Sequence, residues 1–178
     1  ALGGPAVAVA TGGVGHTCAL LADGKVRCWG YNGFGQLGVG HTQNLGDQPG
    51  ELPTPEAVVG GTVVSLSLGT YVSCVLLDTG KVRCWGRGVQ TGIGPSGLGN
   101  NVGAAPGEMP PPDTQLGGLA VKLPPHGGTR DLLCARMDDA KLRCWGLTTN
   151  CGCGWTSPQT GMWLGDNETP ASVNPVPY

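Results

Sequence analysis

The stretch HTCALLADGKVRCWG at residues 16–30 decides the fold, because the chain carries near-copies of it at residues 72–86 (VSCVLLDTGKVRCWG) and 131–146 (DLLCARMDDAKLRCWG). The first cysteine of each copy stands at position 18, 74 or 134, and the second follows with nine residues between them. A recurrent spacing of this size indicates a repeat architecture, in which one supersecondary unit is copied and stacked.

Each copy predicts a β-hairpin closed by a short loop. If Ala22, Asp23 and Gly24 form a three-residue loop with Gly24 in the left-handed conformation, counting back places Cys18 opposite Cys28. A non-hydrogen-bonded pair of this kind has its Cα atoms about 4.5 Å apart, which is within reach of a disulfide. The same count in the other copies gives two more predicted disulfides, Cys74 with Cys84 and Cys134 with Cys144.

The third hairpin departs from the pattern at Ala140, which stands where the other two loops have glycine. A left-handed alanine costs roughly 1 kcal/mol or more, so we expect a different turn there. A zinc site is the alternative use of these cysteines, but zinc ligands usually occur as Cys-x2-4-Cys pairs with further Cys or His nearby. The spacing here and the three histidines of the chain fit that pattern poorly.

Alternation along the hairpin assigns its faces. Leu20 and Val26 share the cysteine face, which we expect to be buried. Lys25 and Arg27 point the other way and are predicted to keep an exposed face soluble, with a recurrent binding stripe as the alternative. The tryptophan of each copy is predicted to pack in the core; these are Trp29, Trp85 and Trp145.

Composition excludes several classes of function. Glycine and proline (34 and 15 of 178 residues) are abundant, and they favour strands joined by turns over long helices. A net charge of −2 gives no basic footprint for nucleic acid, and no apolar run approaches membrane-spanning length. We find no paired acids, phosphate loop or zinc-hydrolase motif. The sequence therefore predicts a protein that is not an enzyme, with no catalytic residue, metal site or cofactor.

Residues 16–40, HTCALLADGKVRCWGYNGFGQLGVG, resemble a blade of the regulator-of-chromosome-condensation repeat family. The matching features are the His-Thr-x-Ala-Leu segment, the Asp-Gly turn, the Trp-Gly pair and the Asn-x-x-Gly-Gln-Leu-Gly segment of residues 32–38. The cysteine-containing form resembles the secreted bacterial and algal branch. The resemblance weakens in the second copy, where RGVQTGIGPSGLG follows the tryptophan, and in the third, where LTTNCGCGWTSPQTGMWLG does.

The resemblance implies an all-β fold of three propeller blades of antiparallel strands within a single repeat domain, residues 1–178. We place the blades at about residues 7–58, 59–116 and 117–176. Each ends in a Gly/Pro-rich loop, and we interpret these loops as alike in placement and unlike in sequence. Variable loops on a constant scaffold are where binding function usually lies.

Three blades are fewer than the four to eight that close a propeller. We therefore expect an open arc with two uncovered ends, which are a liability unless something covers them. Neighbouring blades of a longer chain, a second copy closing a ring, and head-to-tail addition into a filament remain alternatives. Residues 6–10 read as a small strand, either the first strand of blade one or one that completes a neighbouring blade.

Other features lie outside the repeat. Cys151 and Cys153 are predicted to bond to another chain or to each other. Trp155 and Trp163 are interpreted as part of a local core, with binding-loop aromatics as the alternative. Asn167 begins an Asn-Glu-Thr sequon and is a candidate glycosylation site.

Paired cysteines indicate an oxidising compartment, so we expect an extracellular, secreted protein. The favoured function is that of a structural or assembly protein in a fibril, coat or wall, which associates with itself or with neighbouring blades. The alternative is a secreted binding module that recognises a protein partner or glycans through its Gly/Pro-rich loops. A nuclear exchange factor, which the family name suggests, is disfavoured by the cysteine pairs and by the absence of a basic patch.

Overall fold

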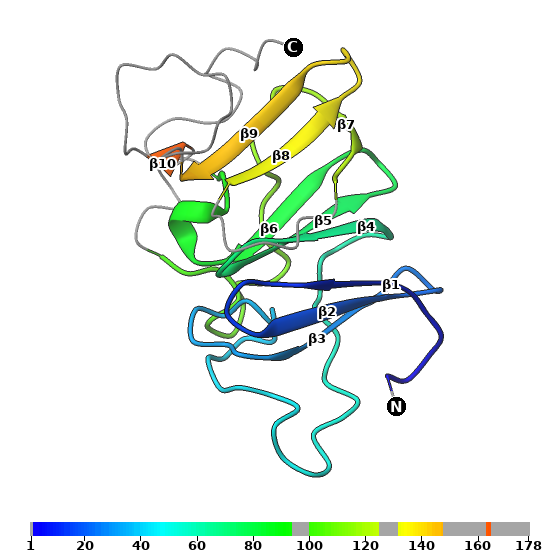
Figure 1. The fold of residues 1–178 in the computed structure, drawn as a ribbon, viewed down its shortest axis with the longest axis vertical. Coiled ribbons are helices and arrows are strands. Elements are labelled where there is room, and N and C mark those ends of the chain that lie inside the picture. Colours follow the sequence, from blue (N-terminus) through cyan, green and yellow to red (C-terminus); the bar gives the residue numbers. More distant parts are fainter. Residues whose placement is uncertain (1, 94–99, 125–131, 148–162, 165–178) are drawn as a thin grey trace.

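The computed structural model describes residues 2–93, 100–124, 132–147 and 163–164. It contains three antiparallel sheets, one for each copy of the repeated stretch. Figure 1 shows them stacked one after another along the long axis of the molecule, with the sheet of the second copy in the middle. The all-β class predicted from the repeats is confirmed.

The first two sheets have the same order of three strands. Sheet one comprises β1 (Ala6–Thr11), β2 (His16–Leu21) and β3 (Val26–Gly30). Sheet two comprises β4 (Val63–Leu68), β5 (Val72–Leu77) and β6 (Val82–Gly86), and a 3-10 turn, η1 (Gly88–Gln90), follows it. Residues 6–10 are thus paired with β2 as the first strand of blade one.

Sheet three has the strand order β10-β9-β8-β7. Its strands are β7 (Ala120–Lys122), β8 (Leu132–Met137), β9 (Leu142–Leu147) and β10 (Trp163–Leu164). In the other two blades, single bridges take the place of this outer pairing, from Gly30 to Leu45 and from Gly86 to Val102. The outer layer of each blade therefore returns to the same glycine of the Cys-Trp-Gly segment.

The hydrophobic core lies between the blades. The Cys18–Cys28 face of sheet one packs with Leu66 and Val75 of sheet two in one cluster. The opposite face of sheet two, with Cys74 and Cys84, packs against sheet three in a second cluster. Strand β5 is consequently buried along its whole length, with alternate side chains entering the two clusters.

The first strand of each blade has a register shift at an equivalent position, between Ala6 and Ala8, between Val63 and Ser65, and between Ala120 and Lys122. The residue skipped at each shift is a valine: Val7, Val64 or Val121. These three valines are exposed in every blade, at 64%, 53% and 50%. An irregularity that recurs at the same place is a built feature of the strand.

Candidate functional site

The three hairpins have the predicted register, with Cys18 opposite Cys28, Cys74 opposite Cys84 and Cys134 opposite Cys144. The sulfur atoms of these pairs lie 2.09, 2.13 and 2.10 Å apart, and the Cα atoms 4.1, 4.1 and 4.0 Å apart. Each hairpin is thus closed by a disulfide of the kind counted from its loop.

The expectation of a different third turn is wrong. Ala140 has a φ of 65°, close to the 81° of Gly24 and the 80° of Gly80. Its amide donates to the carbonyl of Met137, as the amide of Gly24 donates to that of Leu21. The surrounding hairpin therefore holds an alanine in the left-handed conformation that glycine adopts in the other two loops.

A loop of blade one joins it to blade two. The carbonyl oxygen of Gln36 accepts hydrogen bonds from Nε1 of Trp85 at 2.9 Å and from the hydroxyl of Ser73 at 2.8 Å. Leu37, beside it, is buried in the cluster between the two blades. The Gln-Leu-Gly segment that carries the family resemblance therefore binds the next blade, and we call residues 32–40 the seam loop.

Glycines in the seam loop permit a close approach of its backbone to blade two. A Cβ atom on Gly38, whose φ is 70°, would lie 2.7 Å from Nε1 of Trp85. One on Gly35 would lie 2.4 Å from the amide nitrogen of Ala104, and the amide of Gly40 donates to the carbonyl of Gly103. A side chain at these glycines would push the two blades apart.

Blade two has a counterpart of the seam loop, which is harder to recognise in its sequence. Gln90 and Thr91 are buried, and a Cβ on Gly92 would lie 2.8 Å from the ring of Trp145 in blade three. Gly92 has a φ of 68°, so it matches Gly38 in conformation, and like Gly38 it lies against the tryptophan of the next blade. The signal that reveals this loop is Gln-x-Gly after the Trp-Gly pair, in a loop two residues shorter than in blade one.

The outer face of blade one lacks the cover that its equivalents have. Val9 lies opposite Ala19, as Leu66 lies opposite Val75 in blade two. Leu123, which follows Lys122 on blade three, holds the same position. Leu66 and Leu123 are 4% and 1% exposed, whereas Val9 is 60% exposed. The preceding blade covers this position in blades two and three.

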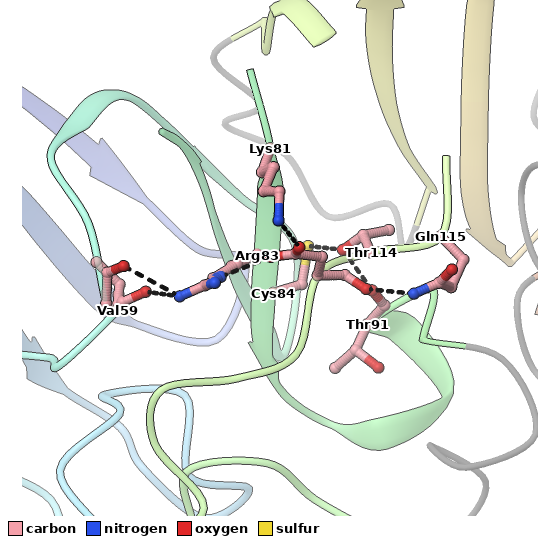
Figure 2. A network of polar contacts seen from close by, with 9 residues as sticks. Val59, Lys81, Arg83, Cys84, Thr91, Thr114 and Gln115 are labelled. Carbon is pink, nitrogen blue, oxygen red and sulfur yellow. Dashed lines mark hydrogen bonds and ion pairs between the residues drawn. The ribbon is translucent and has the colours of Figure 1, made fainter. Parts of the chain in front are cut away.

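The arginines on the other hairpin face are not the solubilising residues that were predicted. Arg83 lies mostly buried, its Nε 2.8 Å from Asp113 and its Nη1 2.7 Å from the carbonyl of Val59 (Figure 2). Lys81, on the same strand, also reaches Asp113, at 2.7 Å. Blade one repeats the arrangement with Lys25 and Glu56. Arg27 donates there to Glu56 and to the carbonyl of Thr54.

This arrangement fixes the return of the chain to each blade. The backbone of Arg27 forms an isolated β-bridge with that of Glu56, and the backbone of Arg83 with that of Asp113. Each acid is thereby held beside the arginine that it neutralises. Burial alone would raise the pKa of Asp113, but hydrogen bonds from Lys81 and Arg83 and their charges outweigh it and lower that pKa. The lysines remain half-exposed, so the soluble-face interpretation holds for them alone.

The first two Gly/Pro-rich loops share a sequence pattern, contrary to our interpretation of them as unlike. LGDQPGELPTPE at 45–56 and VGAAPGEMPPPD at 102–113 share G-x-x-P-G-E-x-P-x-P followed by an acid. Glu51 accepts from the amides of Gly46 and Gln48, and Glu108 accepts from those of Ala104 and Ala105. The two loops have Gly and Pro at matched positions, and in each a glutamate accepts hydrogen bonds from nearby backbone amides. We therefore assign these loops to the scaffold.

His16 is the buried ionisable group of blade one. Its side chain is fully buried, and neither ring nitrogen has a partner of ordinary hydrogen-bond geometry. Burial lowers its pKa to about 4, although the backbone of Val72 partly offsets this effect. The equivalent positions in the other blades are Val72 and Leu132, so His16 occupies a site that is otherwise apolar.

An aromatic cluster lies on the rim where blades one and two meet. The ring of Phe34 contacts Tyr71 edge-on at a centroid distance of 4.8 Å and Tyr31 at 6.5 Å. The guanidinium carbon of Arg87 lies 5.7 Å from the centroid of Phe34 and 5.6 Å from that of Tyr71. Tyr31 is exposed, so the cluster reaches the surface.

Two of the three repeat tryptophans, Trp85 and Trp145, are fully buried as predicted, and Trp29 is half-buried. The remaining candidate residues, Cys151, Cys153, Trp155 and Asn167, lie outside the described residues, as does the side chain of Trp163. Within the described part of the chain, no group of three or more His, Cys, Asp or Glu side chains is placed to hold a metal ion. None of its helices is long and apolar enough to cross a membrane.

Comparison with known sequences supports the repeat assignment. A profile described as the Regulator of chromosome condensation (RCC1) repeat matches residues 6–36 and 63–90, and a second profile of that description matches residues 23–76. These matches place residues 6–90 of the chain in the RCC1 repeat family. The chain is 42% identical over 90 residues to the ultraviolet-B receptor UVR8 of Arabidopsis thaliana, covering 48% of this chain and 19% of that protein.

A second relative matches more of the chain. The X-linked retinitis pigmentosa GTPase regulator homolog of Caenorhabditis elegans is 28% identical over 145 residues, which cover 80% of this chain and 9% of that protein. The chain thus spans a fifth or less of the length of these two relatives. Their names are those of a receptor and a regulator, not of enzymes.

Solved structures support the fold. Yeast RCC1 (Prp20), in a structure bound to Kap60, superposes with a TM-score of 0.64 at 21% identity, over 97% of this chain and 37% of that one. Human WBSCR16 superposes with a TM-score of 0.55 at 22% identity, over 83% of this chain and 35% of that one. The chain therefore has the fold of a segment of an RCC1-type propeller, as the family resemblance implied.

Proposed function

We propose that this chain is an extracellular assembly protein, which works by packing its open blade face against further blades and not by catalysis. The observation that carries the proposal is the contrast between Val9, which is exposed, and the buried residues Leu66 and Leu123 at the equivalent positions. A face whose equivalents are covered in the other two blades, in a chain stabilised by disulfides and partly exposed ion pairs, favours association with protein.

The extracellular part of the proposal rests on the cysteine pairs. Each hairpin holds one disulfide, and such bonds persist in oxidising compartments. If the protein works there, material purified from its source with thiols blocked at lysis contains no labelled cysteine at Cys18, Cys28 or their counterparts. Stoichiometric labelling of these cysteines would contradict the extracellular assignment.

Light scattering on a sizing column tests the assembly proposal with the unreduced 178-residue chain. Assembly predicts a molar mass above that of one chain, and the mass distinguishes a closed ring from an open filament. A sharp dimer indicates a ring of about six blades, whereas a broad distribution of very large species indicates a filament. A monomer at every concentration would contradict the proposal.

A binding module for another protein is the second candidate function, and the rim cluster favours it. Tyr31, Phe34 and Tyr71 with Arg87 combine aromatic and guanidinium groups, which are enriched at protein interfaces. The Gly/Pro-rich loops support this candidate less, because two of them share one sequence pattern and one capping arrangement. Phe34→Ala separates the candidates, because a rim-binding module loses its partner while an assembly protein still associates.

A further inference from the structure

The chemistry of the two internal seams defines what the open face of blade one accepts. At the first seam, a backbone carbonyl of the seam loop receives the indole N–H of Trp85 and the hydroxyl of Ser73. At the second, Gly92 of the Gln-Thr-Gly segment lies against the ring of Trp145. The indole Nε1 of Trp145 has no hydrogen-bond partner in the described part of the chain, so this seam repeats the packing of the first without its hydrogen bond. Each seam therefore joins a Gln-x-Gly loop on one blade to the tryptophan of the next.

Blade one carries the receiving half of the same seam. Thr17 lies across from Trp29 in the register that places Ser73 across from Trp85. Trp29 and Thr17 are half-buried, whereas Trp85 and Ser73 are buried. An indole N–H, a hydroxyl and the exposed Val9 thus occupy the positions that blade one covers in blade two.

The sequence carries a third copy of the inserting half. Gln159-Thr160-Gly161 follows the third Cys-Trp-Gly segment and repeats the Gln90-Thr91-Gly92 tripeptide of blade two residue for residue. Blade three is thus the third blade of the chain to carry a Gln-x-Gly segment, while the receiving face of blade one has no such loop from the described residues.

We propose that the face of blade one formed by Val9, Thr17 and Trp29 is a docking surface for a second copy of this chain, which presents the Gln159-Thr160-Gly161 segment of its third blade. Association is then head to tail, and the contact repeats the seams within the chain. This inference rests on the proposed assembly function and specifies its contact.

Two exposed valines on the same strand supply a matched test. Val9 has buried counterparts in the other blades, whereas Val7 has exposed counterparts in Val64 and Val121. We expect Val9→Asp to weaken self-association by more than about tenfold, because docking would bury its carboxylate. Val7→Asp, which adds the same charge to an equally exposed site, is expected to leave association within about twofold of the wild type.

Light scattering of the unreduced variants across a concentration series gives the readout, and coincident denaturation curves confirm that both fold. If the wild type associates and Val9→Asp associates equally well, or if both variants lose association alike, the docking surface is wrong while the assembly function stands. If the wild type remains monomeric, both the function and the docking surface are wrong.

A mixing experiment tests the head-to-tail polarity. Gly161→Val is expected to block the inserting half, because Gly38 and Gly92, which match it in sequence, leave no room for a side chain. Neither Gly161→Val nor Val9→Asp alone should associate, but an equimolar mixture should form a discrete heterodimer through the intact half of each. A mixture that stays monomeric, or a Gly161→Val variant that associates as the wild type does, would overturn the proposed contact.

Discussion

The indole Nε1 of Trp85 donates to the carbonyl oxygen of Gln36 at 2.9 Å, across the boundary between two blades. The bond lies in a buried region, where an unpaired donor would be costly. It also sets the spacing of the blades, because the loop that supplies the carbonyl reaches Trp85 only through glycine at position 38.

We predict that Gly38→Ala destabilises the chain more than Gly50→Ala does. Both glycines have positive φ, so both substitutions cost roughly 1 kcal/mol for the left-handed backbone. Gly50 has no atom within 4 Å of an added Cβ. At Gly38 the added Cβ would overlap Trp85, and this overpacking should cost a further amount of about 1–3 kcal/mol. Urea denaturation measures the difference, and equal losses would argue against a tight seam.

The third hairpin gives a prediction of opposite sign. Ala140→Gly should raise the free energy of unfolding by about 1 kcal/mol, because it relieves a left-handed alanine with a φ of 65°. Ala22→Gly, in the loop of the first hairpin, is the control; it should be neutral or destabilising, because glycine adds entropy to the unfolded chain. Denaturant midpoints that fall for both variants would show that Ala140 is unstrained.

His16 should make stability depend on pH. Because its folded pKa of about 4 lies below the ordinary 6.5, the unfolded chain binds more protons between these values, and stability falls as pH falls through that range. The expected loss from pH 7 to pH 5 is about 2 kcal/mol. His16→Val, which introduces the residue found at position 72, should remove that part of the slope. An unchanged slope in this variant would show that His16 does not titrate on unfolding.

The ion pairs made by Asp113 and by Glu56, where the chain returns to blades two and one, should differ in their contribution to stability. Asp113→Asn is expected to cost roughly 1–2 kcal/mol at pH 7, because Asp113 accepts from both Lys81 and Arg83. Glu56→Gln, in the more exposed equivalent of blade one, should cost less than about 1 kcal/mol. The Asp113 carboxylate has a lowered folded pKa, so its contribution is present above the ordinary 3.8 and is lost as pH falls through the folded value. A cost for Asp113→Asn that is the same at pH 7 and at pH 2 would contradict this origin.

The hairpins were predictable from the sequence because their register is local. A three-residue loop fixes which residues face each other, so Cys18 and Cys28 could be paired by counting. The burial of Arg83 was not predictable in this way, because the alternation of side chains was interpreted for a sheet with one solvent-exposed face. A blade in a stack has neighbours on both sides, and the chain returns over its hairpin with Asp113 at the arginine.

The seams depend on contacts between segments far apart in the chain, and local patterns do not specify them. Gln36 and Trp85 are separated by 49 residues, and the shorter loop of blade two disguises Gln90 as the counterpart of Gln36. The one signal in the sequence is Gln-x-Gly after each Trp-Gly pair. The role of this segment follows only from the folded structure, in which its glycine lies against the tryptophan of the next blade.

Hydrogen exchange of the indole N–H groups tests most directly whether blade one receives a seam loop. We predict that the indole N–H of Trp85, bonded to Gln36, is protected at every protein concentration. The indole N–H of Trp29 should exchange rapidly in dilute solution and become protected as the chain associates. A Trp29 exchange rate that does not change while the molar mass rises would contradict this prediction, because association would then use another surface.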